Sequence, residues 1–382
     1  MVKVRPISHK NKKDLDKFIK LPWKIYRDYP AWVPPLISQE RDRFNPEKNP
    51  FYEHAEIQLF LAERDGEVVG RITAHIDFNY NEFHDEKTGF FGFFESINDQ
   101  EVANALFDTV MDWHSQHGME QVLGPASFST NDIVGLLIDA FDLPPVVMMP
   151  YNPPYYVNLI ENYGFTKIKD LLAYKIDVND EFKRFAEHFQ RRLKPMADRA
   201  LANGYTIRNI NLKNWREETE KILIIYNDAW ERNWGFVPWT RNEFMHIAKD
   251  LKDVAIPELA KIVEKDGEPV AFGLVVPDVN IVLKKLNGRI IGPGLFAAIP
   301  YLIGLKKIKR VRLITLGIRK GYRKSGVDSL LYYNMLKDGI GLGYIEECEV
   351  SWLLEDNYLI IRAAQFLKGY HYKTYRLFVK PI

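Results

Sequence analysis

The sequence has little cysteine and almost no net charge. Cys348 is the single cysteine among 382 residues, so no disulfide can form within the chain. The 52 lysines and arginines nearly balance the 51 aspartates and glutamates, which leaves a formal charge of +1. Without a field of one sign, nothing draws the whole chain to nucleic acid or to an acidic surface. We therefore predict neither a disulfide scaffold nor a nucleic-acid-binding protein.

Long hydrophobic runs are also missing. The longest uncharged run, residues 290–305, is shorter than the ~20 apolar residues that a transmembrane helix needs, and Pro300 interrupts it. Residues 1–5 lack the apolar core of a signal peptide. These absences predict a cytoplasmic protein without membrane association. One alternative stays open, in which residues 292–305 form a helix that lies in a membrane surface.

A basic turn before a helix is the strongest local feature that is present. Residues 311–318 are aliphatic and β-branched, which favours a strand, and the apolar residues from Val327 onward recur at helical spacing. Between them lie Arg323, Lys324 and Gly326. The first N–H groups of a helix lack partners within it and favour an anion, and a glycine lets that anion approach. The turn at residues 323–328 is therefore predicted to hold a pyrophosphate, although a solvated connection has the same composition.

The elements after this turn carry a resemblance to a known family. Residues 347–352 favour a strand, Asn357 can begin the next helix, and Gly369 with Tyr370 precedes a final aromatic strand. This order, together with the spacing Arg323-x-x-Gly326-x-Asp328, resembles the GNAT acyltransferase superfamily. Asp328 departs from the family pattern, which has glycine or alanine there.

The resemblance implies a fold and a cofactor. The fold would be an α/β, largely antiparallel mixed sheet flanked by helices. The cofactor would be acetyl-CoA or another acyl-CoA, bound between the strands at 313–317 and 347–352. Its pantetheine would pair with the main chain at Leu316, Gly317 and Ile318. The remaining cofactor-binding positions implied are Arg323, Lys324, Ser325, Gly326, Val327, Asp328 and Asn357.

The resemblance also implies acid–base chemistry, because an amine that attacks a thioester must lose a proton and the thiolate must gain one. Glu349 and Glu355 are the candidate bases. Glu349 is equally consistent with a salt-bridged strand residue, and Glu355 with a helix cap. The family often places a tyrosine donor where this sequence has Gln365, so Tyr358 is the candidate donor, with Tyr332 and Tyr333 as alternatives. No histidine has a second ligand at metal-binding spacing, so no metal is predicted.

Three landmarks recur in the same order and at nearly the same separation. Trp32-Val33-Pro34 corresponds to Phe236-Val237-Pro238, Asp65-Gly66 to Asp266-Gly267, and Gly164-Phe165 to Gly369-Tyr370. The chain is thus predicted to contain two tandem GNAT-like domains, at residues 1–177 and 205–382, joined by a helical linker at 178–204.

The two predicted domains are not equivalent. In the first, the position of the basic turn falls at residues 95–99, where Glu95 and Asp99 would repel a diphosphate and no glycine is present. We expect this domain to have lost cofactor binding. The predicted function is acyl-CoA-dependent N-acyl transfer, with acetyl as the expected group, to a small-molecule or peptide amine by a monomer or homodimer. A catalytically silent acyl-CoA-binding or interaction protein is the alternative.

Overall fold

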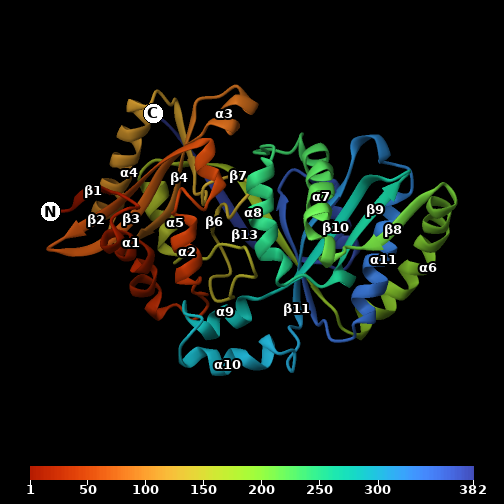
Figure 1. Ribbon diagram of the computed structural model, residues 1–382. Helices are drawn as coiled ribbons and strands as arrows, with labels where there is room; N and C mark the ends of the chain where they lie inside the picture. The colour runs from red at the N-terminus through yellow and green to blue at the C-terminus, as the bar shows by residue number, and fades with distance from the viewer. The chain divides into compact units, whose positions relative to one another are not determined.

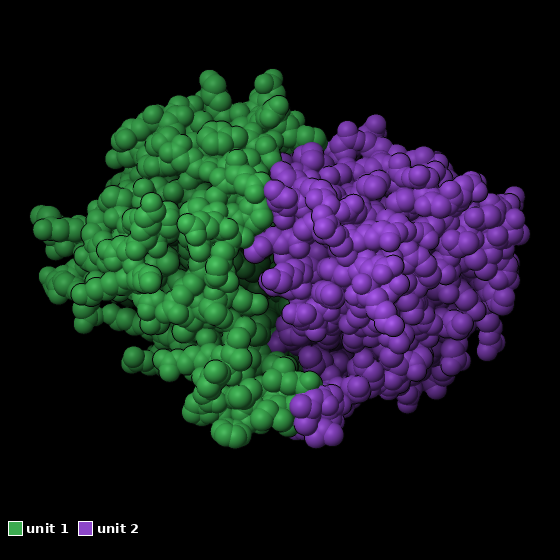
Figure 2. Space-filling view, viewed as in Figure 1, with its two compact units in different colours: residues 1–171, 280–302, 373–382 green, residues 172–279, 303–372 purple.

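The computed structural model describes residues 1–382, which form two compact units (Figure 2). Unit 1 contains Met1–Leu171, Asn280–Leu302 and Lys373–Ile382. Unit 2 contains Leu172–Val279 and Ile303–Tyr372. Neither unit is one continuous stretch of sequence, so the packing units differ from the two sequence halves. The division into repeated domains at residues 1–177 and 205–382, with a linker at 178–204, remains a prediction.

Unit 1 is built on a mixed sheet in the order β1-β2-β3-β4-β5-β13, and β6 pairs with β13 (Figure 1). The pairing is antiparallel except between β4 and β5. Its strands are β1 (Lys3–Ile7), β2 (Ala55–Arg64), β3 (Glu67–Asp77), β4 (Thr88–Ser96), β5 (Gln121–Gly124), β6 (Leu136–Leu137) and most of β13 (Tyr370–Pro381). Its helices are α1 (Lys12–Ile25), α2 (Ile37–Arg43), α3 (Phe78–His84), α4 (Gln100–Gln116), α5 (Tyr155–Asn162), α9 (Asn280–Leu286) and α10 (Pro293–Leu302).

Unit 2 repeats this strand order as β8-β9-β10-β11-β12-β7, and β11 and β12 form a parallel pair. Its strands are β8 (Tyr205–Asn209), β9 (Ala260–Lys265), β10 (Glu268–Pro277), β11 (Arg310–Ile318), β12 (Glu347–Leu354) and part of β7 (Thr166–Asp177). Its helices are α6 (Asp180–Ala202), α7 (Trp215–Trp230), α8 (Arg241–Lys252), α11 (Val327–Gly341) and α12 (Tyr358–Phe366). The α/β fold with mixed sheets flanked by helices, predicted from the sequence, is confirmed.

The last strand of each sequence half is exchanged. β7 ends the first half, yet it pairs with β12 of unit 2, where the amide of Val178 just beyond it donates to the carbonyl of Glu346. β13 ends the second half, yet it pairs with β5 of unit 1, with Phe378 opposite Gly124. Both strands therefore contain residues of both units.

Asp-Gly between two strand-like runs is a short-range signal for a hairpin, and both Asp-Gly pairs of the repeat form one. Asp65 and Gly66 join β2 to β3 with φ angles of 52° and 82°, and Asp266 and Gly267 join β9 to β10 with φ angles of 52° and 85°. Positive φ at both central residues gives the turn whose twist matches that of paired strands, and Asp-Gly is the sequence that tolerates it best. The β2–β3 and β9–β10 hairpins occupy the same place in their two sheets.

Each unit has a separate buried core. In unit 1, the apolar face of α4, which includes Leu106 and Phe107, packs with sheet residues such as Phe91 and Phe94. In unit 2, Leu330 and Leu331 of α11 pack with Val263 and Val270 of the sheet. Ala197 and Ala200 of α6 belong to this second core, so most of the segment predicted as a linker is a packed helix of unit 2.

Candidate active site

The parallel strands β11 and β12 of unit 2 separate before either strand ends. Their last paired residues are Leu313 and Val350, whereas β11 continues to Ile318 and β12 to Leu354. A bulge against β10 leaves Ile314 outside the ladder at this same point. Bulges bend a strand and disrupt its pairing. Beyond Leu313, the edge of β11 that faces β12 therefore has no strand to pair with, and residues 313–316 are all partly exposed.

The corresponding strands of unit 1 separate too, but the protein itself fills the gap. Pairing of β4 with β5 ends at Phe90 and Leu123, and β4 also has a bulge, against β3. Here every residue of β4 is buried. The amide of Ser96 donates to the hydroxyl of Tyr156 at 2.9 Å. A side chain of α5 therefore takes a main-chain hydrogen bond of β4 that a neighbouring strand or a ligand could otherwise make.

A glycine sets the backbone of the predicted phosphate-binding turn. Gly326 lies at the N-cap of α11 with φ 88°, and no side chain caps this helix. Only glycine adopts such a conformation without steric cost. Lys324 also has positive φ, at 64°, and is exposed. The side chain of Ser325 turns back to the carbonyl of Tyr322 at 2.6 Å.

Most positive charges of this turn are engaged by the protein. Arg323 donates from Nη2 to the carbonyl of Ala229 at 2.9 Å, and Arg319 pairs with Asp228 at 3.2 Å. Lys320 pairs with Glu231. The exposed Lys324 is therefore the cation of the turn best placed to receive an anion.

Several predicted cofactor residues have side chains in the protein interior. Leu316 and Ile318 pack against the core beneath α11, and Val327 is buried in it. A Cβ on Gly317 would lie 2.2 Å from the ring of Trp230, so this glycine accommodates the α7 tryptophan. Gly317 and the buried Val327 would have to contact a cofactor through the main chain.

Two further cofactor candidates lie at helix starts. Asp328 is exposed in the first turn of α11, where a carboxylate suits the helix dipole. Asn357 is the N-cap of α12, and its side chain accepts from the amide of Ile360 at 3.5 Å.

Glu349 lies at the point where β11 and β12 separate, in a buried polar network. Arg312 is directly opposite it on β11 and donates from Nε to Ser351 Oγ at 2.9 Å. Ser351 and the hydroxyl of Tyr372 both hydrogen-bond to the Glu349 carboxylate. Glu349 is 2% exposed and Arg312 4%. These partners reduce the cost of burying the carboxylate and fix its orientation.

The other two predicted catalytic residues follow β12. Glu355 is half-buried just after the strand, and Tyr358 is the first residue of α12 with 67% of its surface exposed. Cys348 is the neighbour of Glu349, and burial raises the pKa of its thiol to about 12, which keeps it protonated at neutral pH. A cysteine nucleophile is therefore not supported.

Sequence reasoning missed three members of the Glu349 network: Arg312, Ser351 and Tyr372. The alternation of side chains along a strand places Glu349 and Ser351 on one face, and this signal was available in the sequence. The register with Arg312 and the approach of Tyr372 depend on pairing between distant segments, which the sequence does not specify.

The acids at the corresponding turn of unit 1 serve the protein's own structure. Asp99 is the N-cap of α4, accepts from the amide of Glu101 at 2.9 Å and pairs with Arg64 at 2.7 Å. Glu95 is buried beside Arg71, whose Nη2 lies 3.4 Å from its carboxylate. Burial raises the pKa of the Glu95 carboxyl, although Arg71 and neighbouring hydroxyls oppose the shift.

Two features are absent over the whole chain. No group of three or more histidine, cysteine, aspartate or glutamate side chains is arranged to hold a metal ion. None of the helices combines the length and apolarity required to cross a bilayer.

Two curated bacterial proteins are similar over nearly the whole chain. The bacterial ceramide synthase of Caulobacter vibrioides is 35% identical over 381 residues, which cover 98% of this chain and 97% of that protein. Protein YghO of Escherichia coli is 35% identical over 375 residues, covering 97% and 94%. No protein-family model matches the sequence.

Solved structures show the same fold. A tandem GNAT protein from the clavulanic acid biosynthesis pathway aligns with the full chain and 98% of its own, with a TM-score of 0.58 and 11% identity. A GCN5-related N-acetyltransferase from Sphaerobacter thermophilus aligns with the full chain and 95% of its own, with a TM-score of 0.51 and 13% identity. The chain therefore has the GNAT fold. The two bacterial relatives at 35% identity are members of its own family.

Proposed function

We propose that this GNAT protein is an acyl-CoA-dependent N-acyltransferase whose donor binds in unit 2. The observation that carries the proposal is the contrast between the two pairs of separating strands. In unit 2, residues 313–316 of β11 are partly exposed beside an unpaired edge, whereas β4 of unit 1 is buried throughout. An extended pantetheine arm needs such an edge, because it can hydrogen-bond to a strand as another strand does.

The remaining donor contacts would come from this edge and from α11. The main chain at Leu316, Gly317 and Ile318 would pair with the pantetheine arm. The free amides at the start of α11, the positive φ of Gly326 and the charge of Lys324 suit the diphosphate. Unit 1 lacks these features at residues 95–99, so we assign no donor to it.

The proposed reaction forms one amide bond and breaks one thioester bond. The lone pair of the acceptor amine attacks the thioester carbonyl, the C–S bond breaks, and the amine nitrogen gives up a proton. Glu349 is our candidate for the base that takes this proton, with Tyr372 and Ser351 orienting it. The departing thiolate takes up a proton, and Tyr358 is the candidate donor.

The acyl group and acceptor are inferred from the relative in Caulobacter vibrioides. That protein is called a ceramide synthase, and a ceramide is an amide between a fatty acid and a long-chain amino alcohol. We therefore favour a fatty acyl-CoA and a long-chain amino alcohol over acetyl-CoA and a small polar amine. The 35% identity, which extends over nearly the whole of both chains, supports this choice.

The test is turnover by the purified protein with a matched set of donors and acceptors. Acetyl-CoA and a long-chain acyl-CoA are each combined with sphinganine or with a short polar amine, and thiol release and the N-acyl product are both measured. We expect product with the long donor and sphinganine. Binding of acyl-CoA without thiol release from any pair would instead indicate an acyl-CoA-binding protein, an alternative that the burial of Glu349 favours.

A further inference from the structure

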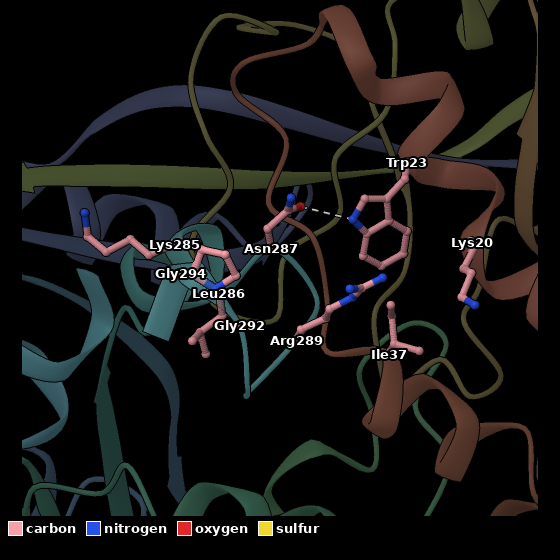
Figure 3. A pocket seen from close by; sticks show the side chains of 10 residues that line it. Lys20, Trp23, Ile37, Lys285, Leu286, Asn287, Arg289, Gly292 and Gly294 are labelled. Carbon is pink, nitrogen blue, oxygen red and sulfur yellow. Dashed lines mark hydrogen bonds between the residues drawn. The ribbon is translucent and has the colours of Figure 1, made fainter. Parts of the chain in front are cut away.

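A cavity of about 520 Å³ in unit 1 lies between α1 and the helical hairpin formed by α9 and α10 (Figure 3). It has three cations in its lining and no acidic residue. The lining residues are Lys20, Trp23, Ile37, Lys285, Leu286, Asn287, Arg289, Gly292, Pro293 and Gly294. The two helices of the hairpin lie in the connection between β10 and β11.

The hairpin is fixed to unit 1 by specific contacts. Trp23 donates from Nε1 to the side-chain oxygen of Asn287 at 3.0 Å, and the amide of Ile37 donates to the carbonyl of Gly288 at 3.0 Å. Gly288 has φ 82°, and a Cβ there would lie 2.4 Å from the Trp23 ring. The cavity and the start of α10 are therefore held by close packing.

The cations of the cavity are unequally neutralised. Lys20 is paired with Asp16 at 2.8 Å. Arg289 is exposed and extends toward Trp23 in Figure 3, whereas Lys285 points away from the indole. The ammonium of Lys285 lies 5.9 Å from the ring centre of Tyr301 on α10. Arg289 and Lys285 thus place positive charge in the same cavity lining as Pro293 and Gly294, at the start of α10.

The segment that follows Arg289 is apolar and exposed. Helix α10 contains no charged residue. Four large apolar side chains in and before it face solvent: Ile290 (54% exposed), Ile291 (86%), Phe296 (79%) and Leu302 (60%). Exposed apolar side chains that gather in one short segment are typical of an interaction site.

We propose that α10, with Arg289 and Lys285, docks on the surface of a membrane that carries anionic phospholipids. The exposed apolar side chains would enter the boundary between headgroups and acyl chains, and the two cations would contact lipid phosphates. Charge complementarity favours an anionic membrane as the binding partner. The cations Lys285 and Arg289 are not neutralised by an acidic residue, and α10 itself carries no charge. The proposal concerns surface docking, so the absence of a spanning helix does not bear on it, and it does not depend on the proposed reaction.

Vesicle flotation of the full-length protein tests this proposal without any acyl donor or acceptor. We expect the protein to float with vesicles of phosphatidylcholine and phosphatidylglycerol, and to float less with phosphatidylcholine alone or at high salt. Ile291→Asp with Phe296→Asp removes two exposed apolar groups and adds charge at the interface, so binding should fall by at least about tenfold. Lys285→Glu with Arg289→Glu should abolish the preference for anionic vesicles.

The matched control is Phe78→Asp, since Phe78 is another exposed aromatic residue in a short helix of unit 1. It should float like the parent, and circular dichroism should show that all variants are folded. The proposal is wrong if the parent does not bind anionic vesicles, or if the α10 variant binds as well as the parent. It is also wrong if α10 mediates self-association instead. In that case light scattering would show the parent as an oligomer that does not bind vesicles, and Ile291→Asp with Phe296→Asp would convert it to a monomer.

Discussion

The hydroxyl of Tyr156 donates a hydrogen bond of 2.7 Å to the carboxylate of Glu95 in the interior of unit 1. The same hydroxyl accepts from the amide of Ser96 at 2.9 Å. One side chain of α5 therefore satisfies both a buried acid and the main chain of β4, at the place where unit 2 has an open strand edge. This arrangement gives a physical reason why the first half would not bind a cofactor, since the groups that could receive it already have partners.

The burial of Glu95 predicts a pH dependence of stability. Its folded-state pKa is raised above the ordinary 4.5, so the folded protein binds a proton more tightly than the unfolded chain does. The stabilising contribution is complete below about pH 4.5 and is lost as pH rises through the folded-state pKa. Glu95→Gln has no such titration. The parent should therefore lose stability relative to Glu95→Gln as the pH increases from about 4.5.

Thermal unfolding of both proteins across a pH series measures this difference. Glu82→Gln is the control, because Glu82 is an exposed glutamate on a helix of the same unit. A stability difference between parent and Glu95→Gln that stays constant with pH, or that changes as much for Glu82→Gln, would contradict the assignment.

Local sequence signals predicted much of the fold. The Asp-Gly pairs at 65–66 and 266–267 are a local signal for two hairpins, and both hairpins are present. These features depend on a few adjacent residues whose φ angles or hydrogen bonds are set locally. Chain order and spacing then sufficed to indicate the GNAT fold.

Features that depend on distant pairing were not predictable. An aromatic strand such as β13 can satisfy its hydrogen bonds equally well beside β5 or beside β12. The exchange of β7 and β13 therefore cannot be recognised from the pattern of apolar residues in the sequence. The same holds for the α9–α10 hairpin, whose attachment to unit 1 depends on Trp23 meeting Asn287. For the site, the sequence indicated Glu349 but not Tyr372, because only the assembled sheet brings their side chains together.

We expect Lys324→Glu to weaken the binding of CoA by at least about tenfold, since a charge-assisted contact to phosphate becomes a repulsion. Lys324 is a cleaner test than Gly326, whose φ of 88° would strain any side chain placed there. Titration calorimetry with CoA measures the effect.

Lys368→Glu is the matched control for Lys324→Glu. Lys368 is also exposed, has the same φ of 64° and lies in the same unit, but it follows the end of α12. Asn98→Glu tests the exposed corresponding position of the first half. Both controls should bind CoA like the parent. Equal losses in Lys324→Glu and Lys368→Glu would argue against a specific phosphate site at the start of α11.

Gly288→Ala should destabilise the protein by about 1–3 kcal/mol, because the new Cβ is forced against the Trp23 ring in a backbone conformation that alanine disfavours. Gly66→Ala isolates the backbone effect. Gly66 has the same φ of 82°, lies in the same unit and has nothing within 4 Å of its added Cβ. Chemical denaturation should show a larger loss for Gly288→Ala, and equal losses would mean that contact with Trp23 contributes nothing.

Glu349→Gln should lower the turnover number by roughly 10²–10⁴ at neutral pH, the usual contribution of a general base, while the Kd for acyl-CoA changes little. The amide keeps the shape of the side chain but cannot accept the proton of the amine. Glu355→Gln is the rival and the control, since Glu355 lies just beyond the end of β12. Single-turnover kinetics and calorimetry separate the two effects. If Glu349→Gln turns over like the parent while Glu355→Gln does not, the base is Glu355, and the buried Glu349 serves only to hold Tyr372 and Ser351 in place.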